Sequence, residues 1–173
     1  MVRVERIAVV LLCLAAGACT QQSSTSTSSP SSSASVTEAG WSFGFCLGPC
    51  LGRLDLQGDQ LIYEVSDRTG DQVFASNRGQ LTSRGATRLE SLASNLSTPL
   101  QETYGCPDCA DGGASFIVIV RAGESRRTEY EYGNPPEELS AIDGFLSGLM
   151  DALGRCRAAP EVILADSCTP VPD

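Results

Sequence analysis

The chain contains no histidine and no lysine among its 173 residues. Histidine commonly activates serine and cysteine nucleophiles, and most catalytic zinc and iron sites use it as a ligand. Its absence argues against these chemistries. Arginine is therefore the only strongly basic residue, and 12 arginines stand against 21 acidic residues, a formal net charge of -9. Phosphate backbones and anionic lipid headgroups would repel such a protein, which argues against nucleic-acid binding.

The apolar run near the N-terminus, residues 7–16, is too short to span a bilayer as a stable helix. It follows two basic residues, Arg3 and Arg6, and precedes a group of small residues. This order is typical of an export signal that is removed by cleavage. The sequence therefore predicts a signal peptide over residues 1–18.

Residues 16–19, Ala-Gly-Ala-Cys, resemble the lipobox of bacterial lipoproteins, with Ala16 in the position that usually holds leucine. The resemblance implies that Cys19 becomes the first mature residue and carries a lipid, which anchors the protein to the bacterial membrane outside the cytoplasm. A plain secretory signal cut after Ala18 is the alternative. Residues 19–38 are rich in serine and threonine, and this composition predicts a disordered tether.

The cysteines of the remaining domain predict disulfides. Cys13 lies in the signal peptide and Cys19 at the lipid site, which leaves an even number, as expected of a disulfide framework in an exported domain. Closing a short loop costs less entropy than closing a long one, so the spacing favours three local pairs. Pairing across loops stays open, because it depends on whether the fold brings the Cα atoms within about 7 Å. The candidates are Cys46, Cys50, Cys106, Cys109, Cys156 and Cys168.

Two other uses of these cysteines also stay open. Residues 46–50 (CLGPC) and 106–109 (CPDC) have spacings found in four-cysteine zinc sites, although thiols outside the membrane are more often oxidised than metallated. CPDC also has the spacing of thiol-disulfide oxidoreductases, in which a helix N-terminus lowers the pKa of the first thiol. Here a predicted strand follows the motif instead of a helix. Because the activating helix is missing, an envelope thiol-disulfide oxidoreductase that uses CPDC is kept as the alternative function and is not the favoured one.

The hydrophobic pattern predicts a single α+β domain over residues 39–173. Two alternating runs flank Gly58-Asp59, which is typical of a β-hairpin. The unbroken apolar run 114–121 predicts a central strand, and the shorter runs predict strands at 72–75, 126–132 and 162–164. The predicted order is β-β-β-α-β-β-α with an optional final strand, which forms a two-layer sandwich with both helices on one face of a mainly antiparallel sheet.

Two helices are predicted from their caps and their apolar stripes. The first begins at Thr82 or Ser83 and is stopped by Pro99. The second has Asn134 as its expected cap and Gly154 at its end. Its stripe is the longest in the chain and is expected to face the core: Leu139, Ile142, Phe145, Leu146, Leu149, Met150 and Leu153.

The run Cys46-Leu47-Gly48-Pro49-Cys50, followed by an alternating strand, a Gly-Asp turn and residues 61–64, is similar to a family of bacterial domains of unknown function. The signature of that family reads Cys-Phe-Gly-x-Cys-Pro-x-Tyr before a strand, and here Leu51 and Arg53 stand in place of its proline and tyrosine. Residues 132–136 (YGNPP), placed between a strand pair and a helix, also resemble the family. The resemblance implies a fold and an extracytoplasmic setting without an activity.

These observations predict a non-catalytic binding or interaction module with no cofactor, no metal and no catalytic residue. Its expected partners are the membrane, through the lipid on Cys19, and an envelope protein or ligand, but not nucleic acid. Glu129 and Glu131 lie on one face of a predicted strand and are candidates for the paired acids of a hydrolase. The neighbouring Arg127 favours a solvated charged face instead.

Overall fold

The computed structural model describes residues 33–96 and 99–172. The predicted signal peptide, the lipid site at Cys19 and most of the predicted tether lie outside the described residues. Within the described ranges there are two α-helices, α1 (Ser83–Ser94) and α2 (Glu137–Gly154), and a short 3-10 helix, η1 (Cys109–Asp111). The same ranges contribute eight strands to one sheet: β1 (Ser35–Ser42), β2 (Leu51–Gln57), β3 (Gln60–Ser66), β4 (Val73–Leu81), β5 (Thr103–Tyr104), β6 (Ala114–Arg121), β7 (Glu124–Glu131) and β8 (Val162–Leu164).

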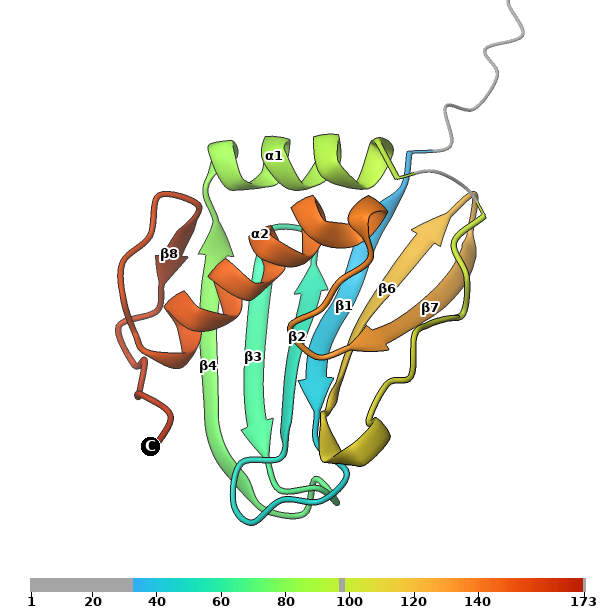
Figure 1. Ribbon diagram of the computed structural model, residues 1–173. Helices are drawn as coiled ribbons and strands as arrows, with labels where there is room; N and C mark the ends of the chain where they lie inside the picture. The colour runs from blue at the N-terminus through green and yellow to red at the C-terminus, as the bar shows by residue number, and fades with distance from the viewer. Residues whose placement is uncertain (1–32, 97–98, 173) are drawn as a thin grey trace, which may run out of the picture. The chain divides into compact units, whose positions relative to one another are not determined.

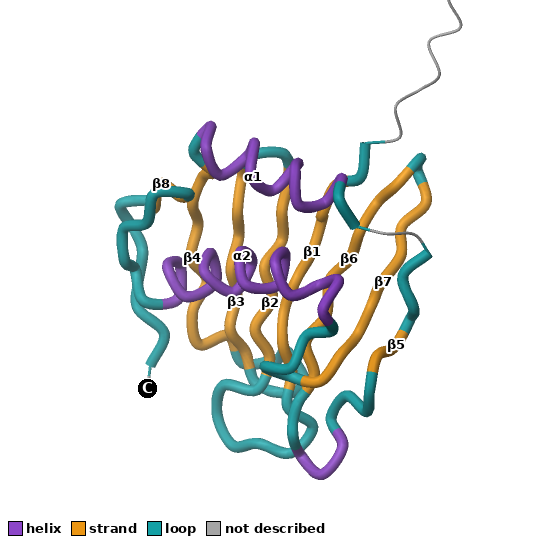
Figure 2. The backbone as a smooth tube through the Cα atoms, turned by 45° about the horizontal axis from the view of Figure 1, so that its top comes forward, coloured by secondary structure: helices purple, strands orange, loops and turns teal. Residues whose placement is uncertain are grey.

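Both helices lie on one face of the sheet, as Figure 1 and Figure 2 show. The strands follow the spatial order β5-β7-β6-β1-β2-β3-β4-β8. All neighbouring strands are antiparallel except β5 and β7, which are parallel. The predicted α+β class with a mainly antiparallel sheet is confirmed.

The predicted order of elements omitted two strands, β1 and β5. Residues 35–38, assigned to the tether in the sequence analysis, form the first half of β1. Their polar composition is like that of the tether, but Val36 and Ala39 face the helices and are only 5% and 1% exposed. β1 pairs with β2 on one side and β6 on the other, so both of its backbone edges are hydrogen-bonded inside the sheet. β1 is therefore an interior strand of the sheet, and so is β6, which pairs with β1 and β7.

The other strands lie close to their predicted positions. β2 and β3 form the predicted hairpin around Gly58-Asp59, and β6 and β8 have the predicted bounds. β4 continues to Leu81, beyond the predicted end at Ala75. Asn77 and Gly79 have low strand propensity, but both pair with β3 and both lie on the buried face of β4. Pairing with a neighbouring strand therefore overrides local propensity here.

The two helices begin in different ways. Of the two predicted caps of α1, Thr82 is the cap residue, because its hydroxyl accepts a hydrogen bond from the N–H of Gly85 at 3.1 Å, and Ser83 is the first residue of the helix. The prediction for α2 was wrong at its first residue, since Pro136 is the cap residue and Asn134 lies outside the helix. The Asn134 amide instead donates to the Glu131 carboxylate at 2.9 Å. All seven residues of the predicted stripe of α2 are buried, and they form the core with the apolar residues of the sheet.

Candidate binding groove

The structure joins the six domain cysteines in three local pairs: Cys46 with Cys50, Cys106 with Cys109, and Cys156 with Cys168. The Cα atoms of these pairs are 5.8, 5.5 and 5.7 Å apart, within the usual range for a disulfide. These are the pairs that the loop-closure argument favours. None of the described residues forms a group of three or more histidine, cysteine or acidic side chains suited to a metal ion.

The first two pairs nevertheless lie in neighbouring loops. The N–H of Gly44, next to the CLGPC loop, donates to Asp108 Oδ1 in the CPDC loop at 3.0 Å. Asp108, Ala110 and Asp111 have positive φ angles, and the last residue of the motif, Cys109, begins the three-residue η1. The CPDC cysteines therefore lie in a twisted loop rather than at the start of an α-helix, which is the arrangement that activates thiols in oxidoreductases.

Peptide mapping under non-reducing conditions is expected to recover the three local disulfides and no other. The physical reason is that the fold places each pair at bonding distance within its own loop. Because the CLGPC and CPDC loops are neighbours, peptide mapping distinguishes disulfides within each loop from disulfides between the two loops. A disulfide between the CLGPC and CPDC peptides, or free thiols with bound zinc, would contradict the local pairing.

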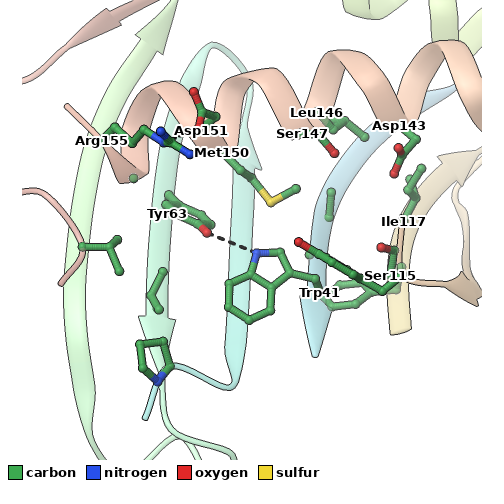
Figure 3. Close-up of a pocket in the computed structure, with 18 of the residues that line it drawn as sticks. Trp41, Tyr63, Ser115, Ile117, Asp143, Leu146, Ser147, Met150, Asp151 and Arg155 are labelled. Carbon is green, nitrogen blue, oxygen red and sulfur yellow. Dashed lines mark hydrogen bonds and ion pairs between the residues drawn. The ribbon is translucent and has the colours of Figure 1, made fainter. Parts of the chain in front are cut away.

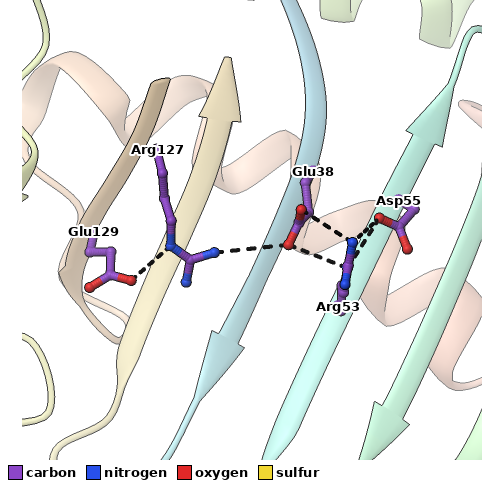
Figure 4. Close-up of polar contacts among 5 residues, drawn as sticks. All are labelled: Glu38, Arg53, Asp55, Arg127 and Glu129. Carbon is purple, nitrogen blue, oxygen red and sulfur yellow. Dashed lines mark hydrogen bonds and ion pairs between the residues drawn. The ribbon is translucent and has the colours of Figure 1, made fainter. Parts of the chain in front are cut away.

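Glu129, one of the candidate paired acids, lies on the face of the sheet opposite the helices. Figure 4 shows it beside Arg127, whose Nε is 2.8 Å from its carboxylate. The Arg127 guanidinium also lies over the ring of Phe116, 3.6 Å from the ring centroid. The guanidinium therefore covers Phe116 on the face of β6 that points away from the helices. For this reason β6 can carry apolar side chains on both of its faces.

The ion pairs of this face continue across the sheet. Arg127 lies 3.9 Å from Glu38 on β1, which also pairs with Arg53 on β2 at 3.3 Å, and Arg53 in turn pairs with Asp55 at 2.9 Å. Figure 4 shows these side chains in a row across the strands. The row alternates in sign, so each carboxylate has an arginine beside it. This is a solvated charged face, as the sequence favoured.

Glu131, the other candidate acid, has a different set of contacts. It accepts hydrogen bonds from the Asn134 side chain at 2.9 Å and from the backbone N–H of Cys106 at 3.0 Å. These two bonds lower the pKa of the Glu131 carboxyl below its usual value. Glu131 therefore fastens the start of the CPDC loop to the end of β7, which is a structural contact.

A groove with a volume of about 530 Å³ runs between α2 and the face of the sheet beneath it. Figure 3 shows Trp41 and Tyr63 on the sheet, facing Asp143, Met150 and the other groove residues of α2. Aromatic residues make up only 6% of the chain, yet the single tryptophan and three of the four tyrosines line this groove. They are Trp41, Tyr63, Tyr130 and Tyr132.

The repeat of two residues in strands and the repeat of about four residues in the helix place these side chains on the same groove. Alternate residues of a strand point to the same face of the sheet. The groove side therefore carries both Ala39 and Trp41 of β1. It also carries Tyr130 of β7 and Tyr132, which directly follows β7. On α2 the spacing of four residues places Asp143, Ser147 and Asp151 along one side of the helix. Most of the groove is therefore formed by regular elements, the strands of the sheet and α2.

Two hydrogen bonds fix the orientation of polar side chains in the groove. The Tyr130 hydroxyl donates to Asp143 Oδ1 at 2.6 Å, and the Trp41 indole N–H donates to the Tyr63 hydroxyl at 3.2 Å. Burial raises the pKa of the Asp143 carboxyl, although the bond from Tyr130 opposes this effect. Burial also raises the pKa values of Tyr63 and Tyr130, so both phenols stay protonated at neutral pH.

The two ends of the groove differ. At one end, Asp151 and Arg155 form an ion pair at 2.6 Å, and the C-terminal segment 170–172 closes the wall. This segment is attached to α2 by the N–H of Val171, which donates to the carbonyl oxygen of Gly154 at 2.8 Å. At the other end, Trp41, Phe43 and Tyr132 form an aromatic cluster with ring centroids 4.9 to 6.3 Å apart.

The main residues of this groove do not stand out in the sequence. Tyr63 and Tyr130 fall within predicted strands, and Asp143 falls within the second predicted helix. One signal was available, because Asp143 directly follows Ile142 and lies beside the apolar stripe of α2. A carboxylate at the margin of a buried stripe needs a polar partner. Its partner, Tyr130, lies on β7 and could be named only from the fold.

No family model, curated protein or solved structure matches this chain. In the described part of the chain, neither helix has the length and apolar character needed to cross a membrane.

Proposed function

We propose that this protein is an exported, lipid-anchored protein of the bacterial cell envelope whose domain binds a ligand, without catalysis, in the groove along α2. The observation that carries the binding role is the groove itself, an aromatic-lined concavity with the Asp143–Tyr130 pair in its wall. Small-ligand sites are typically concavities of about 300 to 1,000 Å³ with a mainly apolar lining and a few placed polar groups. The groove has this size, and its lining combines aromatic and aliphatic side chains with polar ones.

The protonation and hydrogen bonding of the polar groups in the groove favour a binding role over a catalytic one. The phenols of Tyr63 and Tyr130 have raised pKa values and each takes part in a hydrogen bond, so they act as fixed hydrogen-bonding groups and not as bases. The ring of Trp41 is oriented by its bond to Tyr63. Preorganised side chains of this kind lower the entropy cost of holding a ligand.

A fragment screen by NMR on the ¹⁵N-labelled protein tests the binding role. Small neutral, anionic and cationic aromatic or alkyl compounds are added singly, and chemical-shift changes are expected to gather on the Trp41 indole and on the groove side of α2. Ser147→Trp places a bulky ring in the groove and is expected to reduce these changes about tenfold or more. Ser140→Trp, the matched control on an exposed position of α2 outside the groove, should leave them unchanged.

The binding role is contradicted if no compound of any charge shifts the groove residues. It is also contradicted if Ser147→Trp and Ser140→Trp have the same effect, because the shifts would then not report on the groove.

The anchoring role has a separate test. Cells that express the protein are labelled with a clickable fatty acid, and Cys19→Ala is expected to abolish the label and move the protein out of the membrane fraction. Cys13→Ala, which changes a cysteine in the predicted signal peptide, is the control and should keep both. A labelled, membrane-bound Cys19→Ala protein would place the anchor elsewhere.

A further inference from the structure

From the proposed binding role of the groove, we infer the class of its ligand: a molecule with a primary ammonium or guanidinium group that pairs with Asp143, and an apolar stem that lies against Trp41 and the neighbouring tyrosine rings. The inference rests on four observations about the groove. They concern the carboxylate, the charges around it, the rings, and the composition of the chain.

Asp143 is a half-buried carboxylate that forms no ion pair with any residue in ranges 33–96 and 99–172. Its Oδ1 accepts the hydrogen bond from Tyr130 at 2.6 Å, and none of the ion pairs between described residues involves Asp143. The second carboxylate oxygen has no hydrogen bond from a described residue. Burial of a charged group without a counter-ion is costly, and a cation brought by the ligand would offset that cost.

The other charges of the groove do not favour an anion. Among the described residues that line the groove, Arg155 is the single basic one, and its guanidinium is already paired with Asp151 at 2.6 Å. An anionic ligand would therefore meet the Asp143 carboxylate, and the described lining offers it no unpaired basic side chain. The net charge of -9 over the whole chain also raises the local concentration of cations and lowers that of anions.

The rings of the groove suit the rest of such a ligand. Cations are attracted to the faces of tryptophan and tyrosine rings, and the methylene stems of amines pack on the same surfaces. The hydrogen bond between Trp41 and Tyr63 fixes the Trp41 ring, so no ordering of that side chain is needed on binding. Tyr132 is 47% exposed at the mouth of the groove and offers a further ring surface.

The composition of the chain excludes one competitor of the ligand for Asp143, an ammonium side chain of the protein itself. The chain has no lysine, so no ammonium side chain of its own can neutralise Asp143. The protein uses arginine for its ion pairs, and most of these lie away from the groove. A ligand ammonium would therefore be chemically distinct from every strongly basic side chain of the domain.

The test uses three probes that share one stem: pentylammonium, pentanol and pentanoate, each titrated into the full protein at neutral pH and followed by NMR. Pentylammonium is expected to bind about tenfold more tightly than pentanol, because only the ammonium adds an ion pair to its hydrogen bond with the Asp143 carboxylate. Pentanoate is expected to bind more weakly than both, because its charge has the same sign as that of Asp143. Asp143→Asn keeps an acceptor for Tyr130 and is expected to weaken pentylammonium about tenfold while leaving pentanol unchanged.

Two further variants keep the test specific. Asp71→Asn removes one negative charge from an exposed turn outside the groove and should not change the affinity for pentylammonium. Tyr130→Phe frees Asp143 Oδ1 for the ammonium group and is expected to increase the preference for pentylammonium over pentanol, whereas a reduced preference would contradict the pairing with Asp143. This variant also serves if Asp143→Asn does not fold.

The outcomes separate the inference from the proposed function. If pentanol shifts the groove residues and pentylammonium binds no more tightly, the cationic ligand class is wrong and the binding groove stands. Equal weakening of both probes by Asp143→Asn would also overturn the inference, because Asp143 would then only maintain the shape of the groove. If none of the probes shifts any groove residue, the cationic ligand class fails as well, and the wider fragment screen then decides whether the groove binds any ligand.

Discussion

Replacement of Leu149 by alanine is expected to lower the free energy of unfolding by about 2 to 5 kcal/mol. Leu149 is only 2% exposed and belongs to the stripe of α2 that packs against the sheet. The smaller side chain loses burial, and it leaves a cavity that the surrounding strands cannot fill without moving. Urea denaturation followed by circular dichroism gives the difference in stability.

The matched control for Leu149→Ala is Leu47→Ala. Leu47 has the same side chain but is fully exposed, at 101% of its reference area, in the loop closed by Cys46 and Cys50. Its replacement should change stability by less than about 0.5 kcal/mol. Equal losses in the two variants would mean that α2 does not hold the core in the way the structure shows.

Asn77→Ala is expected to cost about 2 to 4 kcal/mol, because it removes three hydrogen bonds from a buried site. Asn77 is 1% exposed, and its amide group donates to the carbonyl oxygens of Leu153 at 2.9 Å and Thr169 at 2.7 Å. Its own oxygen accepts from the N–H of Thr169 at 2.9 Å. One side chain thus ties β4 to the end of α2 and to the C-terminal segment.

The loss in Asn77→Ala should be greatest near the C-terminal segment. Amide hydrogen exchange at Thr169 and Val171 is expected to be faster than in the wild type, in addition to the lower midpoint of denaturation. Asn134→Ala is the control, because its amide is bonded at the surface to Glu131 and its replacement should cost less than about 1 kcal/mol. The prediction fails if the two variants are equally stable and exchange at Thr169 is unchanged.

Asn77 also connects stability to the proposed function. The C-terminal segment 170–172 forms one wall of the groove, and Asn77 holds the residue directly before it. If this contact is lost, that wall is no longer held in place, so ligands of the groove should bind Asn77→Ala more weakly than the wild type. Leu149 does not line the groove, so Leu149→Ala should affect binding mainly through the fraction of folded protein.

Much of the fold could be predicted from the sequence because it depends on local patterns. The apolar stripe of α2 repeats at helical spacing, and each of its residues is buried as predicted. The hairpin of β2 and β3 follows from two alternating runs around a two-residue turn. The cap of α1 at Thr82 is a contact between residues three apart. In each case the residues that decide the structure are neighbours in the chain.

The sequence by itself therefore determined the fold class, the two helices and most of the strands. The tertiary structure alone decided the position of β1, whose polar residues become strand only through pairing with β2 and β6. It also decided the groove, where Asp143 of α2 meets Tyr130 of β7 and Trp41 of β1 meets Tyr63 of β3. These contacts join residues far apart in the chain or on separate elements, and their geometry depends on how strands and helix pack, which no local pattern encodes.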